Sequence, residues 1–262
     1  MFGISGGSSI TFDMDNATDR TSYYLGASVN YYVKYMNDLD ETFIGTFIVT
    51  EVHKNRDRAT ITALDVVSKF DIEVDDWINN ISNGITLTQL CDSLSDRIGV
   101  PILIDETVVN KNEVVGHNYS GGSITGRVVL RHIAELAGGF VIADKAGNVI
   151  ITTYKNKDIN LDNSQYKKLT IADYVVSPIT KINVANVLSD GSNVIVGSGD
   201  NTYLIDSNAL FIDNKSSIQR CANNLLSLIG QFTYTPTTIS LIKDYGINCG
   251  DIINVNGIST FV

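Results

Sequence analysis

The sequence predicts a mainly β protein of the α+β class, in which two strand-rich domains flank a small α+β domain. Apolar and polar residues alternate within residues 1–70, whereas apolar residues recur at three- and four-residue steps within residues 71–170. Alternation returns over residues 171–262, where one further helical stripe interrupts it. With 262 residues, 44% hydrophobic and 18% charged, the chain can bury a sizeable core.

The first domain, residues 1–70, is expected to consist of paired strands. In ASVNYYVKYM, Val29 and Tyr31 alternate with more polar residues, which is the period of a half-buried strand. A second strand is expected to begin at Gly45, and ATITALD is expected to form a third. The six residues HKNRDR (53–58) between them predict a hairpin with a long polar loop.

Two amphipathic helices characterise the middle domain, residues 71–170. The apolar stripe of TLTQLCDSLSDRIG predicts a helix that begins with a capping box of Thr86 and Gln89 and ends at Gly99. A second helix is expected over residues 126–137, where a pair of glycines follows it. FVIADKAGNVIITTY then predicts a hairpin around its Ala-Gly-Asn turn.

The last domain, residues 171–262, is expected to form strands over TKINVANVL, SNVIVGSG and TYLIDS, with one helix that Gly230 ends. GDIINVNGISTFV predicts a closing hairpin with an Asn-Gly turn. The sequence stops within the second strand of that hairpin, which would leave an apolar edge unpaired. We therefore expect a fragment truncated at its C-terminus, and the polar, glycine-rich start favours a first domain that is incomplete at its N-terminus.

Charge and cysteine content exclude several classes of protein. Lys and Arg number 19 against 29 Asp and Glu, a net charge of −10, which disfavours a tight nucleic-acid binder. Cys91, Cys221 and Cys249 form no CxxC pair and no disulfide framework, which favours synthesis in a reducing compartment. No apolar run is long enough to span a membrane, and the N-terminus lacks the features of a signal peptide.

The histidines and glycine-rich stretches match no ligand motif. His53, His117 and His132 lie outside HExxH and away from cysteine pairs, so each is expected to be exposed or structurally satisfied. DMDNATDRTSYY resembles a calcium loop but has Thr where that loop needs Gly and Tyr where it needs Glu. VGSGDN, with Gly197 and Gly199, lacks the third glycine and the helix of a phosphate loop, and predicts a turn.

Carboxylates gather beside the only tryptophan, at Asp75, Asp76 and Trp77. A glycosidase needs two carboxylates across a cleft, and a tryptophan can stack on a sugar. Solvated surface charge and a packing anchor at a domain junction are favoured instead. We therefore assign no catalytic, cofactor-binding or metal-binding residue.

The most basic stretch contains His53, Lys54, Arg56 and Arg58. Asp57 interrupts it and no aromatic residue is interleaved, which disfavours nucleic-acid binding. Two interpretations stay open, a solvated hairpin tip and a charged contact with an acidic neighbouring subunit.

Four segments, taken in order, resemble bacteriophage tail baseplate hub proteins and tail-associated proteins, tube-like hubs related to type VI spike hubs. They are IGTFIVTEVHKNRDRATITALDVVSKFD (44–71), GDNTYLIDSNALF (199–211), FTYTP (232–236) and CGDIINVNG (249–257). Asn208-Ala209-Leu210 stands where the family has an Asn-Pro-Leu-like segment, a small departure.

The resemblance implies two tube-type β-barrel-like domains, 1–70 and 171–262, that flank an inserted α+β domain, 71–170. It implies a non-enzymatic structural hub of a phage or prophage-derived tail, a homotrimer whose pseudo-six-fold ring lets DNA pass. The implied partners are the tail tube or distal tail protein and a spike or fibre, with no cofactor, no specific nucleic-acid binding and no membrane span. The implied location is the virion tail, assembled in the cytoplasm of the bacterial host.

Two other functions remain open. The chain could be the N-terminal platform of a tail-associated peptidoglycan hydrolase, with its catalytic domain beyond Val262. It could also be a stand-alone hydrolase or carbohydrate-binding module that uses the carboxylates and Trp77.

Overall fold

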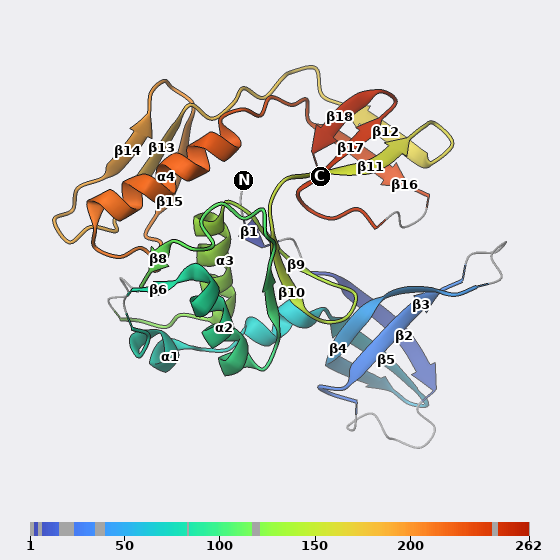
Figure 1. Ribbon diagram of the computed structural model, residues 1–262. Helices are drawn as coiled ribbons and strands as arrows, with labels where there is room; N and C mark the ends of the chain where they lie inside the picture. The colour runs from blue at the N-terminus through green and yellow to red at the C-terminus, as the bar shows by residue number, and fades with distance from the viewer. Residues whose placement is uncertain are drawn as a thin grey trace.

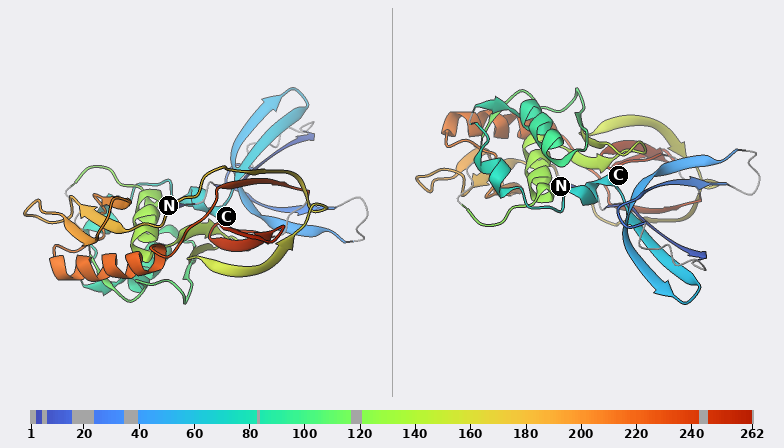
Figure 2. Two further views of the ribbon diagram at one scale, coloured as in Figure 1. Left: turned by 90° about the horizontal axis from the view of Figure 1, so that it is seen from above. Right: turned by 90° about the horizontal axis from the view of Figure 1, so that it is seen from below.

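The computed structural model describes residues 3–4, 7–15, 24–34, 40–82, 84–116, 121–242 and 246–261. The chain is mainly β with four α-helices in this described part, so the predicted α+β class is confirmed. The helices gather at one end of the molecule and two β units lie at the other (Figures 1 and 2). Within the described residues, no helix is both long and apolar enough to cross a membrane.

The first β unit is an antiparallel sheet of strands in the order β2-β5-β4-β3. Its strands are β2 (Ser9–Asp15), β3 (Ser28–Val33), β4 (Thr42–Asn55) and β5 (Arg58–Leu64). Side chains alternate between two faces, and one face carries a small apolar cluster of Phe47, Val49, Ile61 and Ala63. The polar face includes Thr60 and Thr62, as the alternation in ATITALD predicts.

The basic stretch 53–58 is not a long loop, and this prediction was wrong. Strand β4 continues through Asn55 and β5 begins at Arg58, so only Arg56 and Asp57 form the turn. Arg56 has φ 53°, the left-handed conformation that two-residue hairpin turns require. Polar residues can extend a strand wherever its partner continues, because the hydrogen bonds of the ladder join backbone groups.

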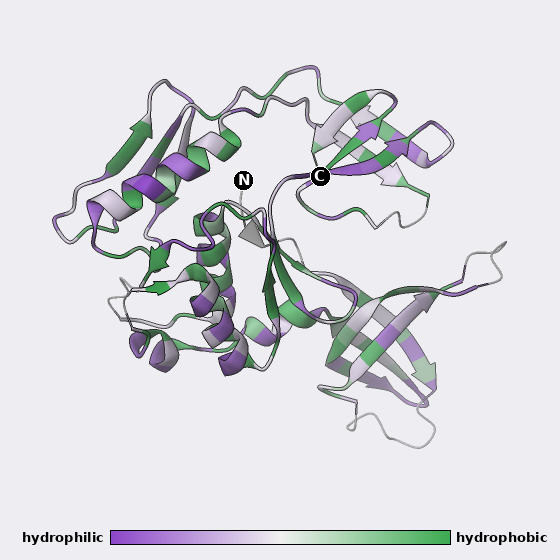
Figure 3. Cartoon of the chain, in the orientation of Figure 1, coloured by the Kyte–Doolittle hydropathy of each residue, from purple (hydrophilic) through white to green (hydrophobic). Residues whose placement is uncertain are grey.

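An α+β body follows the first β unit. Its elements are η2 (Val66–Phe70), α1 (Asp75–Asn79), β6 (Ile85–Thr86), α2 (Leu87–Ile98), β7 (Ile102–Ile104), β8 (Val114–Val115), α3 (Gly126–Ala137), β9 (Phe140–Ala143) and β10 (Val149–Thr152). The sheet order is β1-β9-β10-β7, where β1 is Gly3–Ile4. The hydrophobic colouring of β9 and β10 in Figure 3 matches their burial.

The helix ends in this body follow the sequence signals. Thr86 and Gln89 form a reciprocal capping box on α2, and Gly99 ends the helix in the left-handed conformation. Gly138 ends α3 at φ 66°, and a Cβ there would lie 2.7 Å from Leu225 Cδ2. Gly138 therefore both reverses the chain and lets helix α4 approach closely.

The same body continues after residue 178. Strands β13 (Lys181–Ala185), β14 (Val194–Gly197) and β15 (Thr202–Asp206) form a sheet that packs against α4 (Lys215–Ile229). Helix α4 ends at Gly230 as predicted, but with a right-handed φ of −71°. A Cβ at Gly230 would lie 2.7 Å from Leu226 O, so this glycine serves close packing.

One apolar core joins these elements, from Val66 to Ile229. It includes Leu130 of α3, Ile182 of β13 and Leu225 of α4. The core thus extends across the predicted boundary at residues 170/171. The three-domain division itself remains a prediction.

The second β unit combines segments from before and after β13–α4. Its strands are β11 (Lys155–Leu161), β12 (Tyr166–Ile171), β16 (Thr237–Leu241), β17 (Asp251–Val255) and β18 (Ile258–Phe261). They form a sheet of order β11-β17-β18 and a pair β12-β16. The predicted Asn-Gly turn joins β17 and β18, with Asn256 at φ 50° and Gly257 at φ 85°.

Candidate functional site

The carboxylates beside the tryptophan form local structural contacts. Asp75 Oδ1 accepts a hydrogen bond from Ile124 N at 2.9 Å, and Asp76 lies 3.3 Å from an Arg97 nitrogen. Trp77 is half-buried against the core, and its Nε1 donates to Ser93 Oγ at 3.1 Å. In the part of the chain that the structure describes, no group of three or more His, Cys, Asp or Glu side chains could hold a metal ion.

The histidines occupy contrasting environments. His53 is exposed, and its Nε2 lies 3.4 Å from Glu51 Oε2. His132 is 5% exposed, and burial lowers its pKa to about 4. Its Nδ1 accepts a hydrogen bond from Ala209 N at 3.3 Å, which is the satisfied histidine expected from the sequence. His117 lies outside the described residues.

The two stretches that resemble a calcium loop and a phosphate loop have structural roles in the residues that the structure describes. Asp13 lies in β2 and accepts a hydrogen bond from Thr60 Oγ1 at 2.6 Å, while residues 16–23 are outside the described part. Gly197 and Gly199 have φ 79° and 114° at the end of β14. A Cβ on Gly197 would lie 2.3 Å from Thr180 O, so this stretch is a tight turn, as predicted.

The Asn-Ala-Leu segment binds the second part of the body to helix α3. Asn208 is fully buried, and its Nδ2 donates to His132 O at 3.0 Å and Glu135 Oε2 at 3.1 Å. Asn208 Oδ1 accepts from Leu210 N at 3.0 Å. Burial raises the pKa of Glu135. The buried amide therefore fixes this segment on α3, a role that sequence spacing does not reveal.

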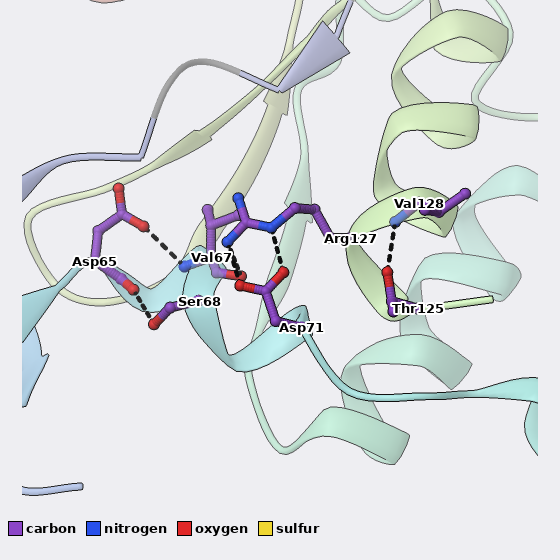
Figure 4. A network of polar contacts seen from close by, with 7 residues as sticks. All are labelled: Asp65, Val67, Ser68, Asp71, Thr125, Arg127 and Val128. Carbon is purple, nitrogen blue, oxygen red and sulfur yellow. Dashed lines mark hydrogen bonds and ion pairs between the residues drawn. The ribbon is translucent and has the colours of Figure 1, made fainter. Parts of the chain in front are cut away.

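A second polar network fixes the first β unit on the body (Figure 4). The guanidinium of Arg127, at the start of α3, forms two hydrogen bonds with Asp71, of which Nη2 to Oδ2 measures 2.7 Å. Arg127 Nη2 also donates to Val67 O at 3.4 Å, and the Asp71 contact raises the pKa of Arg127. Asp65 caps η2 by accepting from Val67 N at 3.1 Å and also accepts from Ser8 N at 2.6 Å. The segment between sheet and body is thus held from both sides.

The sheet of the first β unit ends in two outer strands, β2 and β3. Among the described strands, β2 and β3 each pair with one neighbour only. Tyr31 and Tyr32 on β3 are 40% and 49% exposed. Large aromatic side chains on an open edge are typical of strands that pair with another chain.

The second β unit is similarly open. Strands β11 and β18 are the outer strands of its three-stranded sheet, and β12 and β16 form a separate pair within the described residues. Ile171 and Ile258 are 45% and 46% exposed. These two β units are the arrangement with the clearest functional potential, because unpaired edges can add strands of a neighbour.

Comparison with solved structures identifies proteins of the same fold. The 43 kDa tail protein of prophage MuSo2 from Shewanella oneidensis matches with a TM-score of 0.50 and 14% identity, over 98% of this chain and 88% of that chain. A tail protein from Neisseria meningitidis MC58 matches with a TM-score of 0.54 and 13% identity, over 96% and 84% of the two chains.

None of the protein-family models and none of the curated proteins matches the sequence. At these identities the likeness to solved structures establishes a shared fold. The resemblance to phage tail proteins stated from the sequence is confirmed at that level.

Proposed function

We propose that this chain, which has the fold of two prophage tail proteins, is a structural hub of a phage or prophage-derived tail. Three copies form a ring in which six β units alternate, and the ring joins the tail tube to a spike or fibre. The hub assembles in the host cytoplasm into the virion tail and carries out no chemistry of its own.

The observation that carries this proposal is the pair of open β units at one end of the molecule (Figure 1). Three chains with two such units each supply six β units, the number that matches a six-fold tube. A ring removes the outer edges of every sheet, and closure is how β proteins avoid unpaired edges.

The charge of the first β unit supports a passage for DNA. On the polar face the strand register places Asp13, Thr60 and His53 in one row, Glu51 beside Thr62, and Arg58 between Asp15 and Asn55. In these rows the carboxylates of Asp13, Asp15 and Glu51 outnumber the guanidinium of Arg58. We propose that this face lines the channel, where its carboxylates and a net charge of −10 repel phosphate. A ring structure whose channel is lined by Lys and Arg would contradict this part of the proposal.

The edge of β3 offers a direct test of assembly. Val49 N donates to Ala27 O at 2.9 Å, so the neighbouring Ser28–Ile48 pair is of the type without mutual hydrogen bonds. The N–H of Ser28 therefore points away from β4, toward the open edge. Ser28→Pro removes this donor and places the pyrrolidine ring of proline at the open edge, while the hydrogen bonds between β3 and β4 stay intact.

Mass photometry and light scattering measure the outcome. We expect the wild-type chain and the matched Ser28→Ala variant to form particles of three times 28.5 kDa, and Ser28→Pro to remain a monomer. Circular dichroism checks that both variants are folded. A wild-type chain that stays monomeric at every concentration, or a folded Ser28→Pro variant that still forms trimers through this edge, would overturn the proposed assembly.

A further inference from the structure

A cavity of about 460 Å³ lies where the α+β body meets the second β unit. Five aromatic side chains from separate segments line it: Phe140, Tyr154, Phe232, Tyr234 and Phe261. Among the residues that the structure describes, none of the lining side chains is charged. Its volume falls within the range of roughly 300–1,000 Å³ that is usual for small-molecule sites. It is also about three times as large as an engineered apolar cavity that binds benzene.

The rings support one another in edge-to-face and tilted contacts. Tyr154 is central, with ring centroids 5.1 Å from Phe140, 4.7 Å from Phe232 and 5.5 Å from Phe261. Phe261 also lies 5.6 Å from Tyr234. Aromatic pairs prefer these geometries, so each ring restricts its neighbours.

The backbone behind the rings is fixed by hydrogen bonds. Gly250 has φ 91°, and a Cβ there would lie 2.8 Å from the Phe140 ring, so only glycine lets the ring take its position. Lys155 N donates to Gly250 O at 3.0 Å, and Val176 N donates to Tyr234 O at 2.8 Å. The wall is therefore formed before any ligand arrives, which lowers the entropic cost of binding.

We propose that this aromatic cavity binds an uncharged aromatic group. Tyr154, Phe232, Tyr234 and Phe261 are half-buried, so a ring that enters removes further apolar surface from water. It also gains the edge-to-face contacts that the wall already uses. The described lining offers hydroxyls on Tyr154, Tyr234 and Ser177 but no cation to neutralise a negative charge, which disfavours carboxylate ligands.

The aromatic group can come from a free small molecule or from a side chain of a neighbouring protein. Both sources share the chemistry that the cavity recognises. Tyr174 and Val175, each 60% exposed, precede the lining residue Ser177 and extend the apolar surface beyond the cavity. The inference is independent of the proposed ring and is tested on the isolated chain.

Cys249 is a natural reporter of occupancy. It lines the cavity and is half-buried, whereas Cys91 and Cys221 are each 1% exposed. Burial raises the pKa of Cys249, so labelling with a maleimide is followed at alkaline pH. We expect millimolar indole to slow labelling of the wild-type thiol at least fivefold and to raise the melting temperature. The charged analogue indole-3-carboxylate is expected to leave the labelling rate and the melting temperature unchanged.

Two variants and a second probe complete the test. Ser177→Trp fills the cavity from its exposed rim and is expected to abolish the effect of indole, while the matched Ser216→Trp on the surface of α4 keeps it. N-acetyl-tryptophanamide distinguishes the sources, because tighter binding than indole indicates a protein side chain and weaker binding a free molecule. Unchanged wild-type labelling and melting with both probes would overturn the proposal, and so would protection that persists in folded Ser177→Trp. Labelling of glutathione controls for direct effects on the reagent.

Discussion

His132 couples the stability of the α+β body to pH. The imidazole is 5% exposed and has a folded-state pKa of about 4, against 6.5 for the free group. Burial is the main cause, and the charge of Arg131 adds to it. Between these two values the unfolded chain binds a proton that the folded chain does not, so the folded state loses stability as pH falls.

The size of the effect follows from the two pKa values. Each pKa unit corresponds to about 1.4 kcal/mol, so full protonation below pH 4 removes about 3 kcal/mol. At pH 5 the loss relative to pH 8 is about 2 kcal/mol. Glu135 acts in the opposite direction, because its raised pKa lets the folded chain take up a proton first. The wild-type slope combines both groups, and comparison with a His132 variant isolates the contribution of His132.

Urea unfolding at pH 8, 6 and 5 measures this loss. His132→Asn keeps an acceptor near Ala209 N but cannot titrate, so its free energy of unfolding should fall by about 2 kcal/mol less than that of the wild type. His53→Asn, at an exposed position, is the matched control and should behave like the wild type. Equal pH dependence in wild type and His132→Asn would refute the reasoning.

Two further substitutions test the packing. Gly139→Ala would place a Cβ 2.2 Å from Thr152 O and should lower the free energy of unfolding by about 2–4 kcal/mol. The control Gly7→Ala, whose Cβ would lie 3.7 Å from its nearest atoms, should change the free energy of unfolding little. Equal costs for the two variants would contradict the geometry. Arg127→Ala breaks the half-exposed ion pair with Asp71 and should lower the free energy of unfolding by about 1 kcal/mol. It should also speed proteolysis between residues 65 and 71. An unchanged cleavage rate would show that the network does not hold this segment.

Local signals in the sequence determined the helices and most turns. The capping box at Thr86, the glycine after α2 and the Asn-Gly turn at residues 256–257 act within a few residues, so a short stretch suffices to specify them. The resemblance to tail proteins likewise rested on short segments in the correct order. The fold class follows from the same periodicities.

Only the tertiary structure decided which segments meet. Strand β11 pairs with β17, which lies far along the chain, and β13 pairs in parallel with β15. The period of a strand tells which residues face the core but carries no information about its partner. For the same reason all of HKNRDR except the turn residues Arg56 and Asp57 became strand, since β4 and β5 continue beside each other and supply the ladder.

The candidate surfaces show the same division. Composition and spacing indicated that no catalytic motif is present in the sequence, and the tyrosines of β3 were visible as an alternating strand. The aromatic cavity and the buried amide of Asn208 could not be predicted from the sequence, because the residues around them come from distant segments. Sequence determines local geometry through short-range sterics and hydrogen bonds, whereas contacts between distant segments depend on how the whole chain packs.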